Sequence, residues 1–119
     1  MEKINIDQKL SLFNDYWNPR IIGELNGQLV KLARFKGEFV WHQHDNEDEL
    51  FLVVKGGFRM EYRDKSIELC KNDIVIVPKG VEHRPVADEE VAVLLFEPAT
   101  ILNTGDVINN LTRSTLEKI

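Results

Sequence analysis

The sequence predicts an all-β fold, an antiparallel sandwich or barrel of short strands. Between about residues 28 and 97, short apolar segments recur at regular spacing and are separated by turn residues. One of them, Phe58–Arg63, alternates apolar and charged residues with the period of a half-buried strand. The chain has 119 residues, a usual size for one domain. We therefore expect a single domain over residues 1–119, with its core barrel at about 28–97.

The expected elements follow from turn signals along the chain. A short helix is expected over residues 7–14, with Asp7 as N-cap, and Pro19 ends that stretch. The polar tail after Pro98 carries one weak helical segment, Thr112–Lys118. Between them lie the predicted strands, which in chain order are Leu29–Lys36, Phe39–His44, Leu50–Val54, Phe58–Arg63, Ser66–Leu69, Asp73–Val77, Glu82–Val86 and Val91–Glu97.

Composition excludes several classes of partner. The formal net charge is -5, which argues against nucleic acid and against an anionic membrane surface, since both attract basic proteins. Cys70 is the single cysteine, so no intramolecular disulfide is expected, as in a reducing cytoplasm. No apolar run has the length of a transmembrane helix or the character of a signal-peptide core. We expect a soluble cytoplasmic protein that binds neither nucleic acid nor membranes.

The three histidines of the chain fall in a pattern typical of a metal site. His42 and His44 are two residues apart on a predicted strand, so their side chains share one face. Glu49 opens the next strand after the acidic turn 45–48, and His83 follows a Pro-Lys-Gly turn. Imidazole and carboxylate ligands suit first-row transition metals. The sequence thus predicts one divalent ion, Mn, Fe, Ni, Cu or Zn, on His42, His44, Glu49 and His83, with one or two coordination positions open.

The acidic turn offers two alternative carboxylate ligands, Glu47 and Asp48. The alternation of strand residues between two faces and the six-residue gap from Glu49 to Gly56 favour Glu49 as the carboxylate ligand.

These residues resemble the two motifs of the cupin superfamily. The first motif is matched by Gly37, His42, His44, Glu49 and Gly56, with a spacer one residue short after Gly37. The second is matched by Pro78, Gly80 and His83, while Asn72 and Ala87 replace its usual Gly and Asn. The resemblance implies a double-stranded β-helix, the jelly-roll cupin barrel, with a short N-terminal helical segment. The chain looks similar to small stand-alone cupins that resemble mannose-6-phosphate isomerase.

The resemblance implies a metalloenzyme that acts on a small molecule, either an oxygenase or a sugar or keto-acid isomerase. The alternative is a non-enzymatic cupin that binds or senses a small ligand. An effector-sensing transcription factor would need a helix-turn-helix, for which no segment is long enough. Phe58, Met60 and Tyr62 are predicted to face the interior, either as plain core or as the wall of a substrate pocket. Beyond Tyr62 and the acidic turn, no acid–base residue is apparent.

Two predicted strands, Leu50–Val54 and Val91–Phe96, are apolar on both faces. Their second face must be covered, either by the N-terminal segment or by a second subunit. We predict a homodimer.

Overall fold

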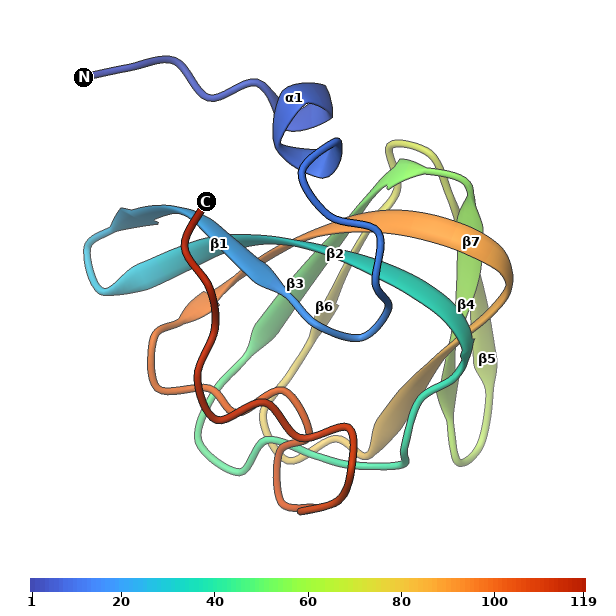
Figure 1. Cartoon of the computed structure of the whole chain (residues 1–119). Helices are drawn as coiled ribbons and strands as arrows, with labels where there is room; N and C mark the ends of the chain where they lie inside the picture. Colours follow the sequence, from blue (N-terminus) through green and yellow to red (C-terminus); the bar gives the residue numbers. More distant parts are fainter.

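One short helix and seven strands form the regular structure of the chain in the computed structural model, which describes residues 1–119 (Figure 1). The all-β expectation is confirmed, because the helix has only five residues and every strand pairing is antiparallel. The elements are α1 (Ile6–Leu10), β1 (Arg20–Leu25), β2 (Gln28–Glu38), β3 (Glu49–Lys55), β4 (Gly57–Tyr62), β5 (Ser66–Cys70), β6 (Ile74–Val77) and β7 (His83–Pro98).

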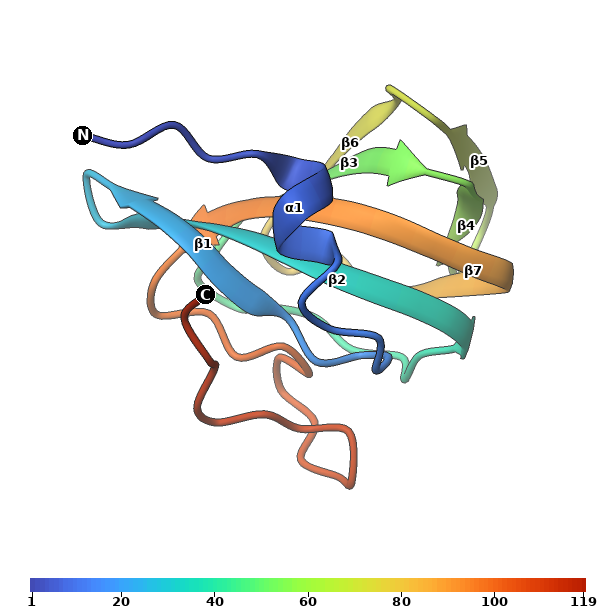
Figure 2. The ribbon, with the colours of Figure 1, turned by 45° about the horizontal axis from the view of Figure 1, so that its top comes forward.

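The long strand β7 joins the two parts of the sheet. Its second half pairs with β2 on one side and with β3 on the other, which gives the order β1-β2-β7-β3-β6. Its first residues, His83–Val86, pair with β4 where the second half pairs with β3, and β4 pairs with β5. The sheet therefore folds over along β7 without closing into a continuous ring of paired strands (Figure 2).

Several elements differ from the sequence-based expectation. Residues 83–98 form one strand, because the acidic segment Asp88–Glu90 is exposed and follows the bend of β7 instead of interrupting it. The helix is capped by Asn5, whose side chain accepts a hydrogen bond from the Gln8 amide, and not by Asp7. The predicted strand at residues 39–44 is irregular, with one isolated bridge between His42 and His83. Residues 112–118 form no helix, and β1 was not predicted.

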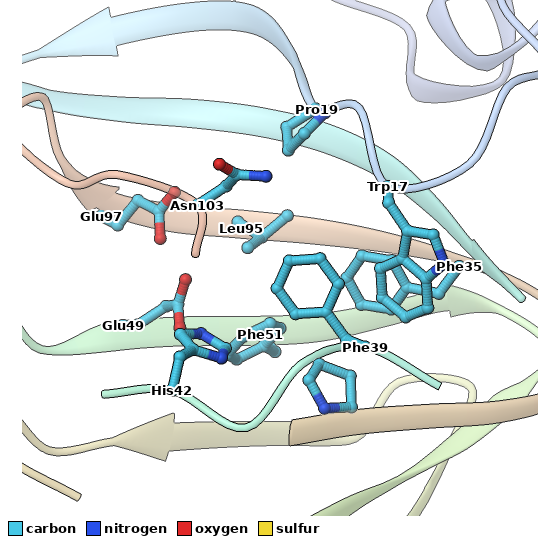
Figure 3. Close-up of a pocket in the computed structure, with 11 residues that line it drawn as sticks. Trp17, Pro19, Phe35, Phe39, His42, Glu49, Phe51, Leu95, Glu97 and Asn103 are labelled. Atoms are coloured by element: carbon cyan, nitrogen blue, oxygen red, sulfur yellow. The ribbon is translucent and has the colours of Figure 1, made fainter. Parts of the chain in front are cut away.

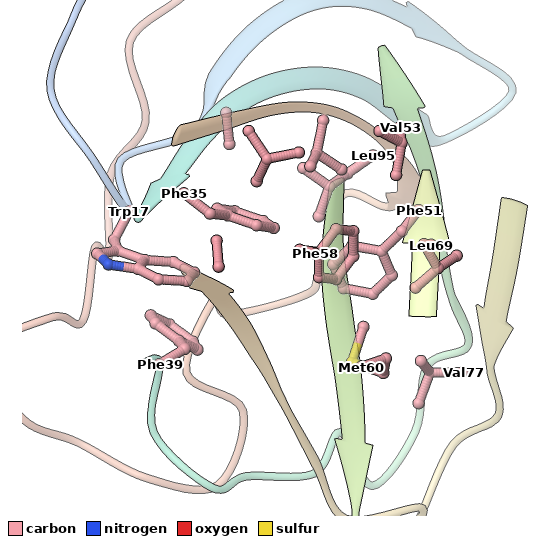
Figure 4. Close-up of a cluster of buried hydrophobic side chains, with 14 residues drawn as sticks. Trp17, Phe35, Phe39, Phe51, Val53, Phe58, Met60, Leu69, Val77 and Leu95 are labelled. Atoms are coloured by element: carbon pink, nitrogen blue, oxygen red, sulfur yellow. The ribbon is translucent and has the colours of Figure 1, made fainter. Parts of the chain in front are cut away.

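The folded sheet encloses a core of fourteen buried residues (Figure 4). Burial of these apolar side chains is the main favourable contribution to folding. Phe58 and Met60, whose inward orientation was predicted, belong to this core, with 3% and 0% of their surfaces exposed. At one end of the core, Trp17 from the N-terminal segment stacks on Phe35 and Phe39, with ring centroids 4.5 Å and 4.7 Å apart. Trp17 therefore closes the end of the sheet nearest the histidines.

The N-terminal segment also covers part of the outer face of the sheet. Leu10 and Phe13 pack against Leu32 of β2 and Ala92 of β7 in a second buried cluster. On β6, in contrast, Ile74 and Ile76 remain 57% and 58% exposed. The chain contains no helix with the length and apolar content needed to cross a membrane.

Candidate metal centre

The fold brings His42, His44, Glu49 and His83 together in the interior. One potential ligand atom from each residue lies within 4.8 Å of the other three, and all four side chains are buried. The backbones of His42 and His83 exchange two hydrogen bonds, of 3.1 Å and 2.9 Å. The two residues therefore lie directly opposite each other, which brings their side chains close together. Glu49 is the first residue of β3, where its side chain points to the inner face of the sheet. The four residues predicted from the sequence thus form one cluster.

Local backbone contacts fix the orientation of two of the rings. Nδ1 of His42 lies 2.9 Å from the carbonyl oxygen of Val40, and Nδ1 of His83 lies 2.8 Å from that of Val81. A carbonyl oxygen only accepts, so each Nδ1 must carry the proton and donate. The lone pair of each ring is then on Nε2, the atom available to a metal.

Three atoms at the centre of the cluster lack a hydrogen-bond partner. They are Nε2 of His44, Nε2 of His83 and Oε1 of Glu49, all fully buried. Both nitrogens lie 3.3 Å from that Glu49 oxygen, a contact that is an ion pair only when the imidazole is protonated. Buried polar atoms in proteins are nearly always paired. A divalent transition ion among these atoms would satisfy all three at once, so the donor set fits such an ion.

The electrostatics of the cluster favour the forms of these residues that bind a metal. Burial, together with the neighbouring His83, lowers the pKa of His42 from 6.5 to about 4. Burial alone would raise the pKa of Glu49, but the adjacent side chains of His44, His83 and Glu97 outweigh it and hold that pKa well below its usual range. At neutral pH, His42 is therefore a neutral imidazole and Glu49 a carboxylate.

The two alternative carboxylates of the acidic turn are engaged elsewhere. Asp48 is exposed, and its Oδ1 accepts a hydrogen bond of 2.9 Å from the backbone amide of Lys79. Glu47 accepts a hydrogen bond of 2.8 Å from the hydroxyl of Thr100. The cluster with metal-ligand geometry therefore contains Glu49 and neither of its two predecessors.

A buried ion pair adjoins the cluster and was missed by the sequence analysis. Nζ of Lys31 on β2 donates to Oε1 of Glu97 on β7 at 2.7 Å, and both side chains are only 3% exposed. The carboxyl of Glu97 faces that of Glu49 (Figure 3). Burial and the charge of Glu49 raise the pKa of Glu97 well above its usual range. The sequence contains one indication that Lys31 points inward. Strand residues alternate between the two faces of a sheet, and Lys31 shares the inward face of its strand with the apolar Ala33.

A small cavity of about 30 Å³ opens beside the cluster, room for one or two water-sized groups. Its polar wall contains His42, Glu49 and Glu97, and its apolar wall is largely aromatic (Figure 3). The predicted pocket residues Phe58, Met60 and Tyr62 do not line it: the first two belong to the core, and Tyr62 is half-buried against that core. The apolar wall comes instead from Trp17, Pro19, Phe35, Phe39, Phe51, Pro85 and Leu95.

The C-terminal tail holds the histidine segment in place. The backbone amide of Asp106 donates to the carbonyl of Gln43, and the Gln43 amide donates to Oδ1 of Asp106, both at 3.0 Å. Gly105, with φ +57°, packs so closely that a Cβ there would lie 2.1 Å from the Gln43 oxygen. Because Gln43 lies between His42 and His44, the tail helps to position both histidines.

Comparison with known proteins places the chain in a family. Residues 29–98 match the Cupin_2 family, described as the cupin domain. The chain therefore belongs to the cupins.

Individual relatives extend this comparison. The uncharacterized protein YdbB from Bacillus subtilis is 44% identical over 64 residues, which are 53% of this chain and 57% of that protein, so the match spans little more than half of this relative. A cupin-2 domain containing protein from Shewanella frigidimarina is 45% identical, with a TM-score of 0.79 over 80% of this chain and 93% of that one. Protein NMB1881 from Neisseria meningitidis is 30% identical, with a TM-score of 0.76 over 82% of this chain and all of that one.

Proposed function

We propose that this chain is a metal-dependent cupin that acts on a small molecule, with one divalent transition ion on His42, His44, Glu49 and His83. The observation that carries the proposal is the set of three buried donor atoms that face one another without hydrogen-bond partners. We also propose that the folded sheet is the double-stranded β-helix barrel expected from the cupin motifs, with Mn, Fe, Ni, Cu or Zn as the candidate ions.

The surrounding residues support chemistry at this centre. A bound divalent ion would polarise a carbonyl or lower the pKa of a water molecule. The backbone carbonyls of Val40 and Val81 orient the imidazoles of His42 and His83 toward such an ion. The aromatic wall makes one side of the cavity apolar, and the carboxyl of Glu97 lies beside the donors as a candidate to contact the reacting molecule. A carboxyl in this position favours a metalloenzyme over a passive carrier.

The cavity lining bears on the type of substrate. It contains no lysine or arginine, whereas recognition of a phosphate group normally uses such cations. The lining supports a small, partly apolar substrate over a phosphorylated sugar, and so an oxygenase or keto-acid isomerase over a sugar-phosphate isomerase. The alternative, a non-enzymatic cupin that binds or senses a ligand, is favoured by the small volume of the cavity behind Trp17.

Elemental analysis tests the metal centre first. Protein purified without a histidine tag should hold, or take up at pH 7.5, about one equivalent of a transition metal per chain. A far smaller uptake of every candidate ion would refute the proposal.

The loaded protein then distinguishes the two functions. Catechols, enediols and keto acids should be incubated with it, with oxygen consumption and hydrogen exchange in deuterated water as readouts. Turnover that depends on the metal supports an enzyme. Binding of these compounds without turnover supports the alternative.

A further inference from the structure

One carboxylate oxygen of Glu97 has no hydrogen-bond partner within the protein. Oε1 of Glu97 accepts the hydrogen bond from Lys31, but Oε2 is fully buried and has no partner. Leu50 of β3 pairs with Phe96 of β7, so the next residues, Glu49 and Glu97, come to adjacent inward positions. Glu97 thereby lines the cavity beside a metal donor but is not among the four clustered ligands.

Stability alone does not explain this arrangement. A buried ion pair gives little or no net stabilisation compared with apolar side chains of the same size. A buried oxygen without a hydrogen-bond donor adds a further cost. The cost is removed if a molecule in the cavity donates a hydrogen bond to Oε2.

We propose that Glu97 is a ligand-contacting residue: its Oε2 accepts a hydrogen bond from a hydrogen-bearing oxygen or nitrogen atom bound at the open position of the metal. Lys31 is a positioning residue, which holds the carboxylate through Oε1. The inference rests on the proposed metal centre and deepens it. The ligand class is water, or the hydroxyl or amino group of a small molecule whose apolar part contacts the aromatic wall.

The charges around the cavity are consistent with this role. Burial and the charge of Glu49 raise the pKa of Glu97 in the metal-free cluster. A divalent ion would offset the charge of Glu49, and Lys31 already donates to Oε1 of Glu97, so beside the ion Oε2 can accept a hydrogen bond. A ligand atom without hydrogen would instead meet the negative oxygen of Glu97 directly. The site should therefore discriminate against anions that carry no hydrogen.

The test compares two small probes on the Co²⁺-loaded protein: hydroxylamine, which carries hydrogen, and azide, which does not. Their affinities are measured anaerobically at pH 7.5 from the visible absorption of Co²⁺. In Glu97→Gln, Lys31 still donates to the amide oxygen, so the amide NH₂ replaces Oε2 and an acceptor becomes a donor. We expect hydroxylamine to bind about tenfold more weakly and azide about threefold or more tightly.

The matched control is Glu89→Gln, an exposed acid on the same strand, which should change neither affinity. If Glu97→Gln does not fold, Lys31→Met/Glu97→Met removes the pair without leaving a buried charge and should give the same opposite shifts. Affinities that are unchanged, or that shift in the same direction, would overturn the role of Glu97 while the metal centre stands. A wild-type protein that takes up no Co²⁺ would overturn both proposals.

Discussion

At the scale of single residues, the chemistry of the cluster depends on one position in an acidic run. Asp48 and Glu49 are adjacent but differ in environment. Asp48 is exposed, and its side chain accepts a hydrogen bond from the backbone amide of Lys79. Glu49 is 4% exposed and faces His44 and His83. Successive residues of a strand point to opposite faces, so a shift of one residue would exchange their environments. The start of β3 at Glu49 therefore selects the carboxylate that can bind a metal.

Substitution of these two residues gives a direct prediction. Glu49→Gln should weaken metal binding by at least about 100-fold, because it removes the one anionic donor of the cluster. Asp48→Asn should leave metal affinity within about threefold, since Asp48 contacts only the loop. Calorimetric titration of both variants with Zn²⁺ measures the difference. An equal or larger loss in Asp48→Asn would show that the carboxylate ligand is misassigned.

The stability of the metal-free protein should depend on the protonation of His42. Its pKa is lowered to about 4 in the folded state from 6.5, so the unfolded chain binds this proton more readily. Stability from His42 is fully present above pH 6.5 and is lost as the pH falls toward 4, by on the order of 3 kcal/mol in the free energy of unfolding.

Urea denaturation of the metal-free wild type and of His42→Gln at a series of pH values isolates this contribution. The wild type should lose more stability than the variant between pH 7 and pH 4. Parallel pH profiles of the two proteins would contradict the contribution of His42 to the pH dependence of stability.

At the scale of elements, the N-terminal segment has a structural role beyond its short helix. Trp17 adopts a left-handed backbone conformation with φ +59°, which is costly for a residue with a side chain. Its backbone amide donates to Arg34 and its indole nitrogen donates to Lys36, so both polar groups are paired with β2. These bonds and the aromatic stack hold the segment over the end of the cavity.

Removal of this side chain should destabilise the protein and open the cavity. Trp17→Ala should lower the free energy of unfolding by about 3–5 kcal/mol, because it deletes a large buried aromatic group. Tyr16→Ala, at an exposed neighbour, should cost under about 1 kcal/mol. Chemical denaturation measures both changes. Similar losses in the two variants would show that Trp17 does not seal the core.

At the scale of the whole molecule, the outer face of the sheet is covered only in part. The N-terminal segment packs on β2 and β7, but on β6 the exposed Ile74 and Ile76 pair across the sheet with Leu52 and Leu50 of β3. An apolar face of this kind is typical of a contact between subunits. We propose that a second copy of the chain covers it, which would make the protein a homodimer.

Sedimentation analysis tests the dimer. The wild type should sediment at twice the chain mass of 13.8 kDa at micromolar concentration. The double substitution Ile74→Lys/Ile76→Lys should give the monomer, because buried lysines oppose association. Ile108→Lys, at an exposed residue of the C-terminal tail, should not change the mass. A monomeric wild type would contradict the proposal.

The sequence by itself determined the all-β class, most of the strands and the four residues of the cluster. Strand periodicity is a local property, and the spacing of His42, His44, Glu49 and His83 survives even though residues 39–44 are irregular. Two errors were also local: the helix cap at Asn5 in place of Asp7, and the helix expected at residues 112–118. The cap is a local matter, because the side chain of Asn5 accepts from the Gln8 amide. At residues 112–118 a tertiary contact outweighs a weak helical preference, since the amide of Ile21 on β1 donates to the carbonyl of Glu117.

Only the tertiary structure decided what surrounds the cluster. Trp17 and Asn103 reach the cavity from segments outside the predicted strand region, and Glu97 meets Lys31 across 66 positions of the chain. For Phe58 and Met60 the sequence left two alternatives, core or pocket wall, and the structure places both in the core. The alternation of strand residues predicts which face points inward but not how deep a side chain lies. Contacts between residues distant in sequence depend on how the sheet folds along β7, which no local pattern encodes.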